Sequence, residues 1–187
     1  MNDIAGLYTA YRAQIQLKSS SVISSIVART RSVGAICESS HWLAEKMFNA
    51  MSAPNSAPIL ELGAGFGSVT QLIPENAISI EREKERFDYL TETFPDRTIL
   101  DCCAIDFMPT LELPTIVLSS IPSVNNPEFA RLRAAVAQAY HRGMIPELVT
   151  YTYFPTNNPF AGIFANEERA GVELRNLPPA FVWRYKC

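Results

Sequence analysis

A buried strand that runs directly into a glycine-rich turn constrains this chain more than any other stretch. Residues 59–68 read ILELGAGFGS, so apolar strand residues are followed at once by alternate glycines. Glycine tolerates positive φ and lets a ligand lie against main-chain N–H groups at the start of the following segment. Dinucleotide-binding turns have G-x-G-x-x-G, and Ser68 stands where their third glycine would be. The turn therefore predicts a ligand site, and its spacing argues against a dinucleotide.

Apolar β-branched stretches alternate with helical periodicity along the rest of the chain. Strands are expected at residues 59–62, 77–81, 98–102, 115–119, 147–154 and 181–186. Helices are expected at residues 41–51, 68–73, 83–94 and 127–140, and a further short helix carries Arg169. This alternation predicts an α/β fold with a mostly parallel sheet covered by helices on both faces. Ligands of such sheets bind beyond the carboxyl ends of the strands, which again indicates the turn after Leu62.

Length and composition fit one main domain with an N-terminal extension. The chain has 187 residues, enough for a substantial core but few for two independent domains. We assign residues 1–54 to a helical extension and residues 55–187 to the ligand-binding domain. The four cysteines have no metal-binding or redox spacing, which indicates a reduced, cytoplasmic protein with no metal site. No apolar run approaches the roughly 20 residues that span a bilayer, so we expect the protein in solution or peripheral on the inner membrane face.

The extension begins with an amphipathic helical pattern. Between Asn2 and Ala28, apolar residues recur at three- and four-residue steps, and basic or polar side chains lie on the opposite face. Residues 1–36 contain four basic residues against Asp3 alone, so the acidic surplus lies in the rest of the chain. Such a helix either contacts an anionic membrane surface or packs on its own domain. Both interpretations remain open at this point.

The run E-x-G-x-G-x-G over residues 61–67 resembles motif I of class I S-adenosylmethionine-dependent methyltransferases. The resemblance implies a Rossmann-like fold with a seven-stranded sheet and S-adenosylmethionine as cofactor. Glu81 follows the turn by about 20 residues at the end of a strand, where a carboxylate can accept both ribose hydroxyls. The implied cofactor-binding residues are Glu61, Gly63, Ala64, Gly65, Gly67, Glu81, Arg82, Cys103, Ala104 and Ser119.

Two positions depart from the methyltransferase pattern. Cys103 stands where many of these enzymes have an Asp that bonds the adenine amine, so Asp101, Asp106 or the backbone would have to replace it. After residue 119 the chain reads Ser120-Ile121-Pro122, whereas adenine N-methyltransferases have Asn/Asp-Pro-Pro-aromatic there. The main domain is acidic and has no basic patch with stacking aromatics, so no nucleic-acid partner is expected.

Two further stretches resemble bacterial phospholipid N-methyltransferases, which methylate phosphatidylethanolamine. Residues 176–183 read NLPPAFVW, and the family has Asn-Leu-Pro-Pro-Ala-x-Val-Trp at its C-terminus. Residues 34–47 contain Gly-Ala-Ile-x-x-Ser-Ser followed by Leu-Ala and Met, as in the family, with Glu38 in place of a proline. The resemblance implies a phospholipid amine substrate, a membrane-binding N-terminal helix, and Ser39 and Ser40 over the cofactor. Ser120-Ile121-Pro122 and residues 151–155 depart from the family pattern.

Methyl transfer to an amine needs a group that takes a proton, because a primary amine is mostly protonated near neutral pH. Tyr151, Tyr153 and His41 are the candidates, either as proton acceptors or as residues lining the amine site. Arg169 is a candidate for binding a lipid phosphate. Alternatives to a phospholipid enzyme are a small-molecule N- or O-methyltransferase in solution, a catalytically silent cofactor- or lipid-binding module and, by fold alone, an RNA adenine methyltransferase.

Overall fold

The computed structural model describes residues 40–52 and 57–187. The expected amphipathic helix of residues 2–28, its membrane contact and Ser39 lie outside these ranges. The described residues belong to the compact unit Glu38–Cys187. In chain order its elements are α3 (His41–Ala50), β1 (Ile59–Leu62), β2 (Ile78–Glu81), α4 (Lys84–Thr93), β3 (Thr98–Asp101), α5 (Ala104–Phe107), the 3-10 helix η2 (Met108–Thr110), β4 (Ile116–Ser119), α6 (Phe129–His141), β5 (Glu147–Thr152), β6 (Asn166–Glu173) and β7 (Ala180–Lys186).

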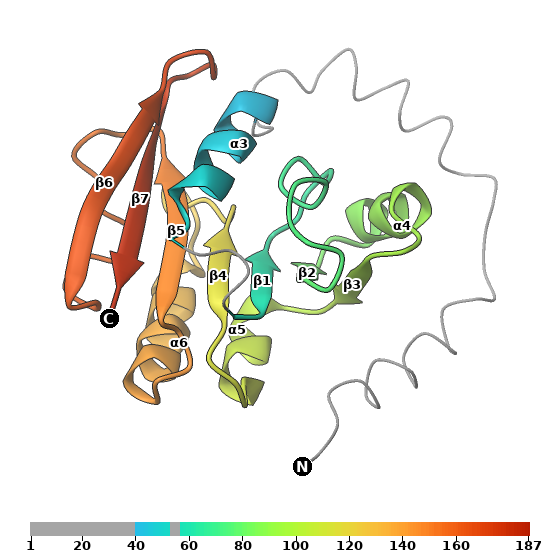
Figure 1. Ribbon diagram of the computed structural model, residues 1–187, viewed down its shortest axis with the longest axis horizontal. Coiled ribbons are helices and arrows are strands. Elements are labelled where there is room, and N and C mark those ends of the chain that lie inside the picture. Colours follow the sequence, from blue (N-terminus) through green and yellow to red (C-terminus); the bar gives the residue numbers. More distant parts are fainter. Residues whose placement is uncertain (1–39, 53–56) are drawn as a thin grey trace. The chain divides into compact units, whose positions relative to one another are not determined.

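The strands form one seven-stranded sheet in the order β3-β2-β1-β4-β5-β7-β6 (Figure 1). The first five are parallel neighbours, whereas β7 pairs antiparallel with both β5 and β6. β1 and β4 are buried along their whole lengths, because the apolar side chains of central strands face helices on both sides. The prediction of a mostly parallel sheet is confirmed. Strand order reverses between β1 and β4, and ligands bind at such a switch point.

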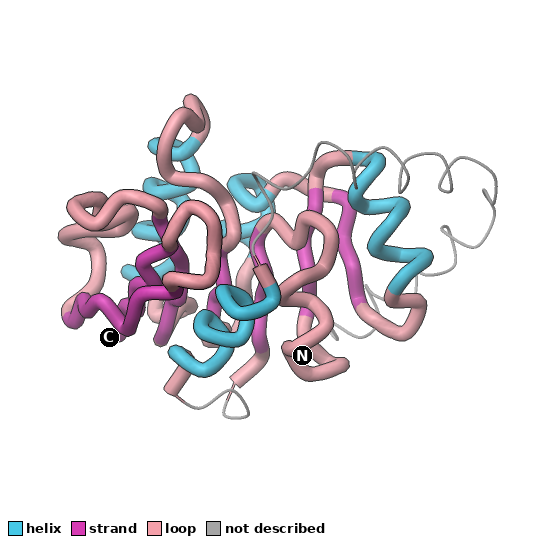
Figure 2. The backbone as a smooth tube through the Cα atoms, turned by 90° about the horizontal axis from the view of Figure 1, so that it is seen from above, coloured by secondary structure: helices cyan, strands magenta, loops and turns pink. Residues whose placement is uncertain are grey.

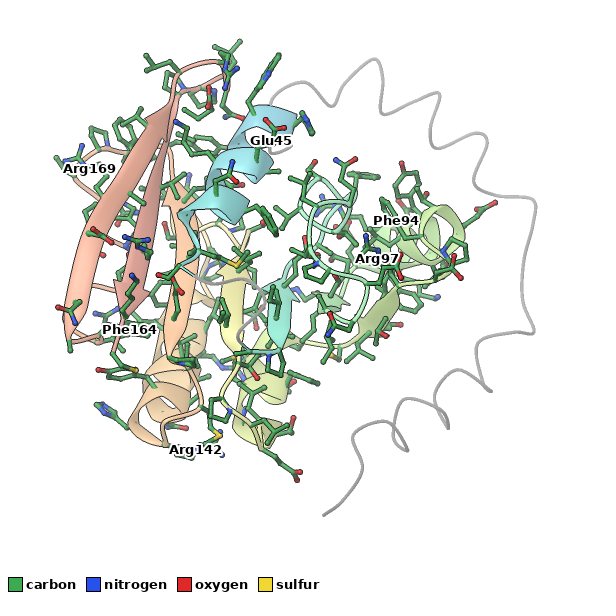
Figure 3. The ribbon with its side chains drawn as sticks, in the orientation of Figure 1. Glu45, Phe94, Arg97, Arg142, Phe164 and Arg169 are labelled. Carbon is green, nitrogen blue, oxygen red and sulfur yellow. The ribbon has the colours of Figure 1, made fainter. Side chains whose placement is uncertain are left out.

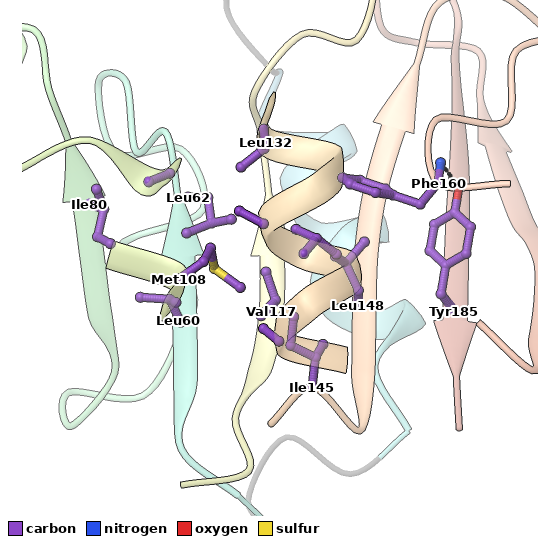
Figure 4. Close-up of a cluster of buried hydrophobic side chains, with 14 of the residues drawn as sticks. Leu60, Leu62, Ile80, Met108, Val117, Leu132, Ile145, Leu148, Phe160 and Tyr185 are labelled. Carbon is purple, nitrogen blue, oxygen red and sulfur yellow. Dashed lines mark hydrogen bonds between the residues drawn. The ribbon is translucent and has the colours of Figure 1, made fainter. Parts of the chain in front are cut away.

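Helices cover both faces of the sheet, as the alternation of strands and helices predicts. On one face, α6 and α5 pack through residues such as Leu132 and Ala104 against Leu60, Val117 and Leu148 (Figure 4). On the other face, the buried side of α3 packs against residues of β1, β4, β5 and β7. Figure 2 shows α3 and α6 on opposite sides of the strands.

The segment after the glycine turn is not the helix expected at residues 68–73. It forms successive turns, with Val69 and Ile73 buried and Thr70 fully buried beside them. The β-branched residues Val69 and Thr70 disfavour a helix, and Pro74 prevents its extension. The buried hydroxyl of Thr70 also bonds to Glu61 from this irregular backbone. The expected helix is therefore wrong.

Arg169 lies on a strand, β6, and not on a short helix. β6 reads NEERAGVE, with little β-branched character, and all of its residues except Glu173 are exposed or partly exposed. It forms the outer edge of the sheet, and its register with β7 shifts between Arg169 and Gly171. Charged residues and irregular pairing are common on edge strands, which must avoid pairing with other chains. These features hide the strand from an analysis based on hydrophobic alternation.

Candidate active site

The three glycines after β1 have left-handed backbone conformations but different surroundings. Their φ angles are +73° for Gly63, +61° for Gly65 and +85° for Gly67. A Cβ on Gly63 would lie 2.9 Å from Ile121 Cγ1, and one on Gly67 would lie 2.3 Å from Phe94 Cε2. A Cβ on Gly65 would meet no atom within 4 Å. Gly63 and Gly67 therefore allow close packing, whereas Gly65 borders space that a ligand can enter.

The carboxylate of Glu81 is fixed beside Gly65. Its Oε2 accepts the Gly65 N–H at 2.8 Å, and its Oε1 accepts the Glu83 N–H at 2.9 Å. Only 5% of the residue is exposed. A carboxylate has about four lone-pair sites, so two backbone donors orient Glu81 and leave each oxygen able to accept another hydrogen bond. The structure thus brings together the two features that the sequence predicts for ribose binding.

Glu61 points into the protein interior and not toward the open space beside Gly65. Its carboxyl is fully buried, and its Oε2 accepts hydrogen bonds from Thr70 Oγ1 at 2.7 Å and Ser79 Oγ at 2.5 Å. Its Oε1 has no hydrogen-bond partner among the described residues. Burial raises the pKa of Glu61 from 4.5 to about 7, while the hydrogen bonds from Ser79 and Thr70 act in the opposite direction. Glu61 therefore stabilises the turn by linking β1 to Thr70, which follows the turn, and to Ser79 of β2.

We expect Glu61 to make the stability of the fold decrease as the pH rises. The folded chain retains the Glu61 proton up to about pH 7, whereas the unfolded chain releases it near the ordinary pKa of 4.5. The contribution of Glu61 is therefore full below about pH 4.5 and is lost as the pH approaches 7, a difference on the order of 3 kcal/mol. Urea unfolding from about pH 5 to 8 should show a smaller loss in Glu61→Gln, which does not titrate. An equal loss in both proteins would contradict this role.

The ends of β2 and β3 bring Arg82 close to Cys103. Arg82 forms an ion pair with Glu128 at the start of α6, and its guanidinium also contacts the Cys103 thiol. The Glu128 carboxylate is the main cause of the raised pKa of Arg82. Cys103 precedes α5 directly, and Ala104 is buried in its first turn. The structure thus groups three predicted cofactor residues here and adds Glu128, which the sequence did not indicate.

Ser119 ends β4 directly at the switch point. It pairs in register with Leu62, the last residue of β1, and the Ser120 N–H donates to the Leu62 carbonyl at 2.9 Å. Ser119 is fully buried, and its Oγ has no hydrogen-bond partner among the described residues. A buried hydroxyl without a partner costs about 1–3 kcal/mol, and this one lies at the switch point of the sheet.

The two candidate tyrosines lie together at the carboxyl end of β5, with Tyr151 on the strand and Tyr153 just after it. The rings of Tyr151 and Tyr153 meet edge to face at 5.4 Å between centroids, and both pack on the core beneath α3. His41 begins α3, where its Nε2 lies 3.1 Å from Glu45 Oε1, and its side chain is 55% exposed. Ser40 caps this helix by accepting the Leu43 N–H at 3.3 Å. The Ser40 hydroxyl thus accepts one hydrogen bond within the chain and keeps its O–H donor.

Arg169 lies away from the glycine turn. It is exposed on β6, the fourth strand from β1 in the sheet order. Its guanidinium lies over Phe181 and Trp183, at 5.7 and 5.8 Å from the ring centroids. Figure 3 shows Arg169 at the outer edge of the sheet and Phe94, which packs at the turn, on the opposite side of the domain. The structure does not bring Arg169 and the predicted cofactor residues together.

Within residues 40–52 and 57–187, no group of three His, Cys, Asp or Glu is placed to hold a metal ion. Over the same residues, every helix is too short or too polar to cross a bilayer. The predicted cofactor residues that lie at the carboxyl edge of the sheet include those of the turn, Glu81, Arg82, Cys103 and Ser119. This set offers hydrogen bonds and charge to an organic ligand.

Comparisons with known proteins find likeness in structure and none in sequence. No family model matches the chain, and no curated protein does. The precorrin-6y C5,15-methyltransferase from Geobacter metallireducens GS-15 has a TM-score of 0.60 at 13% identity, over 81% of this chain and 90% of that one. A dimethyladenosine transferase from Plasmodium falciparum has a TM-score of 0.57 at 14% identity, over 81% of this chain and 62% of that one.

The chain spans only part of some other matching proteins. It covers 38% of the bifunctional kinase-methyltransferase WbdD, with a TM-score of 0.54 at 13% identity over 76% of this chain. It covers 48% of TrmN from Thermus thermophilus, with a TM-score of 0.54 at 14% identity over 78% of this chain. At such identities the likeness shows the fold alone. This chain has the Rossmann-like class I methyltransferase fold.

Proposed function

We propose that this chain binds S-adenosylmethionine at the glycine turn and transfers its methyl group to an amine. The observation that carries this proposal is the Glu81 carboxylate, which is held against the Gly65 N–H at the switch point of the sheet. The solved structures that share the fold include methyltransferases acting on different substrates. The fold and the turn therefore support a cofactor more strongly than they support any one substrate.

The residues present fit this cofactor. Gly65 leaves open space against the backbone, and Glu81 has lone pairs available for the two ribose hydroxyls. The N–H groups of Gly63, Ala64, Gly65 and Gly67 already donate within the chain, so the amino-acid part would lie in the open space beside Gly65 without displacing these bonds. Arg82, Cys103 and Ala104 would border the adenine, and the buried Ser119 hydroxyl would gain a partner. A bound S-adenosylmethionine supplies a methyl group activated by a sulfonium sulfur.

The remaining task of the chain is to hold a neutral amine in line with that methyl group and to accept a proton. Tyr151 and Tyr153 form an aromatic pair at the end of β5. Their rings would line the amine site, because aromatic faces attract the cationic product. One of these tyrosines or His41 would take the proton, directly or through water. Positioning would supply most of the rate enhancement, because the reacting groups need little further activation.

A phospholipid amine is the substrate that the sequence pattern favours. The two stretches that resemble phospholipid N-methyltransferases lie far apart in the sequence, at residues 34–47 and 176–183. Ser40 belongs to the first and Asn176 to the second, and the Ser40 N–H donates to Asn176 Oδ1 at 3.0 Å. Their contact supports the view that the two stretches belong to one pattern, because the fold brings them together.

The test is transfer of a labelled methyl group from S-adenosylmethionine to phosphatidylethanolamine in liposomes. We expect the label in the lipid fraction, and parallel reactions with soluble amines and with RNA should remain unlabelled. Label found only in a soluble amine would replace the lipid by a small-molecule substrate. Label found only in RNA would contradict the expectation that this chain does not act on nucleic acid, which rests on Ser120-Ile121-Pro122. No transfer to any acceptor would overturn the enzymatic proposal.

A further inference from the structure

An exposed apolar tip lies between β6 and β7. Leu174 and Leu177 are 76% and 82% exposed, the highest values among the large apolar side chains exposed in the described part of the chain. Trp42, in the first turn of α3, is 43% exposed beside them. The Arg175 guanidinium lies over the Trp42 ring at 5.2 Å and so joins the two segments. We call Trp42, Leu174, Arg175 and Leu177 the β6–β7 tip.

Buried polar contacts hold the tip in place while its leucines remain in water. Asn176 is 2% exposed, and it joins the tip to the start of α3 by accepting the Ser40 N–H at 3.0 Å. Its Nδ2 donates to the Pro178 carbonyl at 2.7 Å, which fixes the turn itself. Glu173, 3% exposed, accepts the Arg175 N–H at 3.0 Å and Arg175 Nε at 2.9 Å. A loop fixed in this way presents its apolar side chains outward at little further entropic cost.

The tip lies at the same edge of the sheet as the candidate active site. β7 runs antiparallel to β5, and Phe181 near its start pairs with Thr152 at the carboxyl end of β5. The residues just before β7 therefore lie at the carboxyl edge of the parallel strands, where β1 ends before the glycine turn and β2 ends at Glu81 (Figure 1). A surface that contacts the tip would therefore lie along this edge of the sheet.

We propose that the β6–β7 tip docks on a phospholipid bilayer and inserts Leu174 and Leu177 among the lipids. This inference rests on the proposed phospholipid substrate, because an amine at the bilayer surface can only be reached if the site edge faces the bilayer. Trp42 suits the boundary, since its ring has an apolar body and one polar N–H. Arg175 is paired with Glu173, so the leucines supply most of the attraction.

The small size of the tip favours a bilayer over a protein partner. A stable protein interface usually buries about 800 Å² on each side and uses about 20–30 residues. Few apolar side chains at a loop end cannot form such an interface alone, but each gains its full transfer free energy on entering a lipid phase. The tip is therefore suited to insertion and poorly suited to a flat docking surface.

Quenching of Trp42 fluorescence tests the tip directly. The chain contains two tryptophans, so Trp183→Phe leaves Trp42 as the only emitter in the full protein. We expect vesicles of phosphatidylethanolamine and phosphatidylglycerol that carry doxyl-labelled acyl chains to quench Trp42. In the same background, Leu174→Glu/Leu177→Glu should require at least about tenfold more lipid for half-maximal quenching. Leu113→Glu is the matched control, because Leu113 is 51% exposed just before β4, at the opposite edge of the sheet.

The same variants separate this inference from the proposed function. Leu174→Glu/Leu177→Glu should bind S-adenosylmethionine and methylate monomeric lysophosphatidylethanolamine as the parent protein does, and should lose activity only on vesicles. Equal quenching in this variant and the parent would overturn the docking site. The proposal would also fail if the parent protein were a dimer in solution and the variant a monomer, because the tip would then bind a second copy of the chain. Lipid quenching of Trp42 without methyl transfer to either lipid would retain the docking site and refute the phospholipid substrate.

Discussion

Gly65→Ala should weaken S-adenosylmethionine binding by at least about tenfold while leaving the fold largely intact, whereas Gly67→Ala should destabilise the fold itself. A Cβ on Gly65 meets no protein atom within 4 Å, so it would occupy only the space proposed for the ligand. Its φ of +61° adds strain of roughly 1–2 kcal/mol. A Cβ on Gly67 would lie 2.3 Å from Phe94 Cε2. Gly67→Ala would therefore add an overpacking cost of about 1–3 kcal/mol to the cost of its own left-handed backbone.

Urea unfolding and calorimetric titration measure the two effects separately. We expect the unfolding free energy of Gly67→Ala to fall by about 3 kcal/mol and that of Gly65→Ala by about 1 kcal/mol. We expect the larger loss of cofactor affinity in Gly65→Ala, measured at a temperature where both variants are folded. Unchanged affinity in Gly65→Ala would show that the ligand does not lie against this residue.

Glu81→Ala should reduce affinity for S-adenosylmethionine by at least about 100-fold. The Glu81 carboxylate is oriented by the N–H groups of Gly65 and Glu83, and it would accept the two ribose hydroxyls. Hydrogen bonds to a charged group contribute about 1.5–3 kcal/mol each, and a 100-fold change corresponds to about 2.7 kcal/mol. Part of the loss would come from the turn, because Gly65 loses its acceptor.

An analogue of S-adenosylhomocysteine without the 2′ and 3′ hydroxyls separates these two causes. The wild-type protein should bind this analogue much more weakly than S-adenosylhomocysteine, whereas Glu81→Ala should bind both about equally. Such non-additivity indicates direct contact between the carboxylate and the hydroxyls. Equal preference for the hydroxylated ligand in both proteins would mean that Glu81 only supports the turn.

The sequence was sufficient for the parallel strands and the glycine turn because their signals are local. β1 and β4 are short apolar runs whose burial requires a covered sheet, and the distance from the turn to Glu81 is typical of a strand-to-strand crossover. β6 was missed because charged residues on an edge strand hide its alternation. The irregular segment at residues 68–73 was missed because its conformation depends on burying Val69, Thr70 and Ile73 together.

Parts of the candidate site depend on contacts between distant residues, which periodicity cannot reveal. Ser79 gave one usable signal, because a hydroxyl in an otherwise apolar strand needs a buried partner, and Glu61 lies beside it in register. The pairing of Arg82 with Glu128 and the hydrogen bond from Ser40 to Asn176 join segments 46 and 136 residues apart. Such pairs are decided by the tertiary fold and carry no local pattern.

Calorimetric titration of the full wild-type chain with S-adenosylmethionine tests the cofactor site most directly, with NAD as the comparison ligand. The open space at Gly65 and the fixed Glu81 carboxylate lead us to expect one S-adenosylmethionine site per chain. The missing third glycine of a dinucleotide turn leads us to expect no measurable binding of NAD. Absence of S-adenosylmethionine binding, or tighter binding of NAD, would contradict the assignment of the glycine turn.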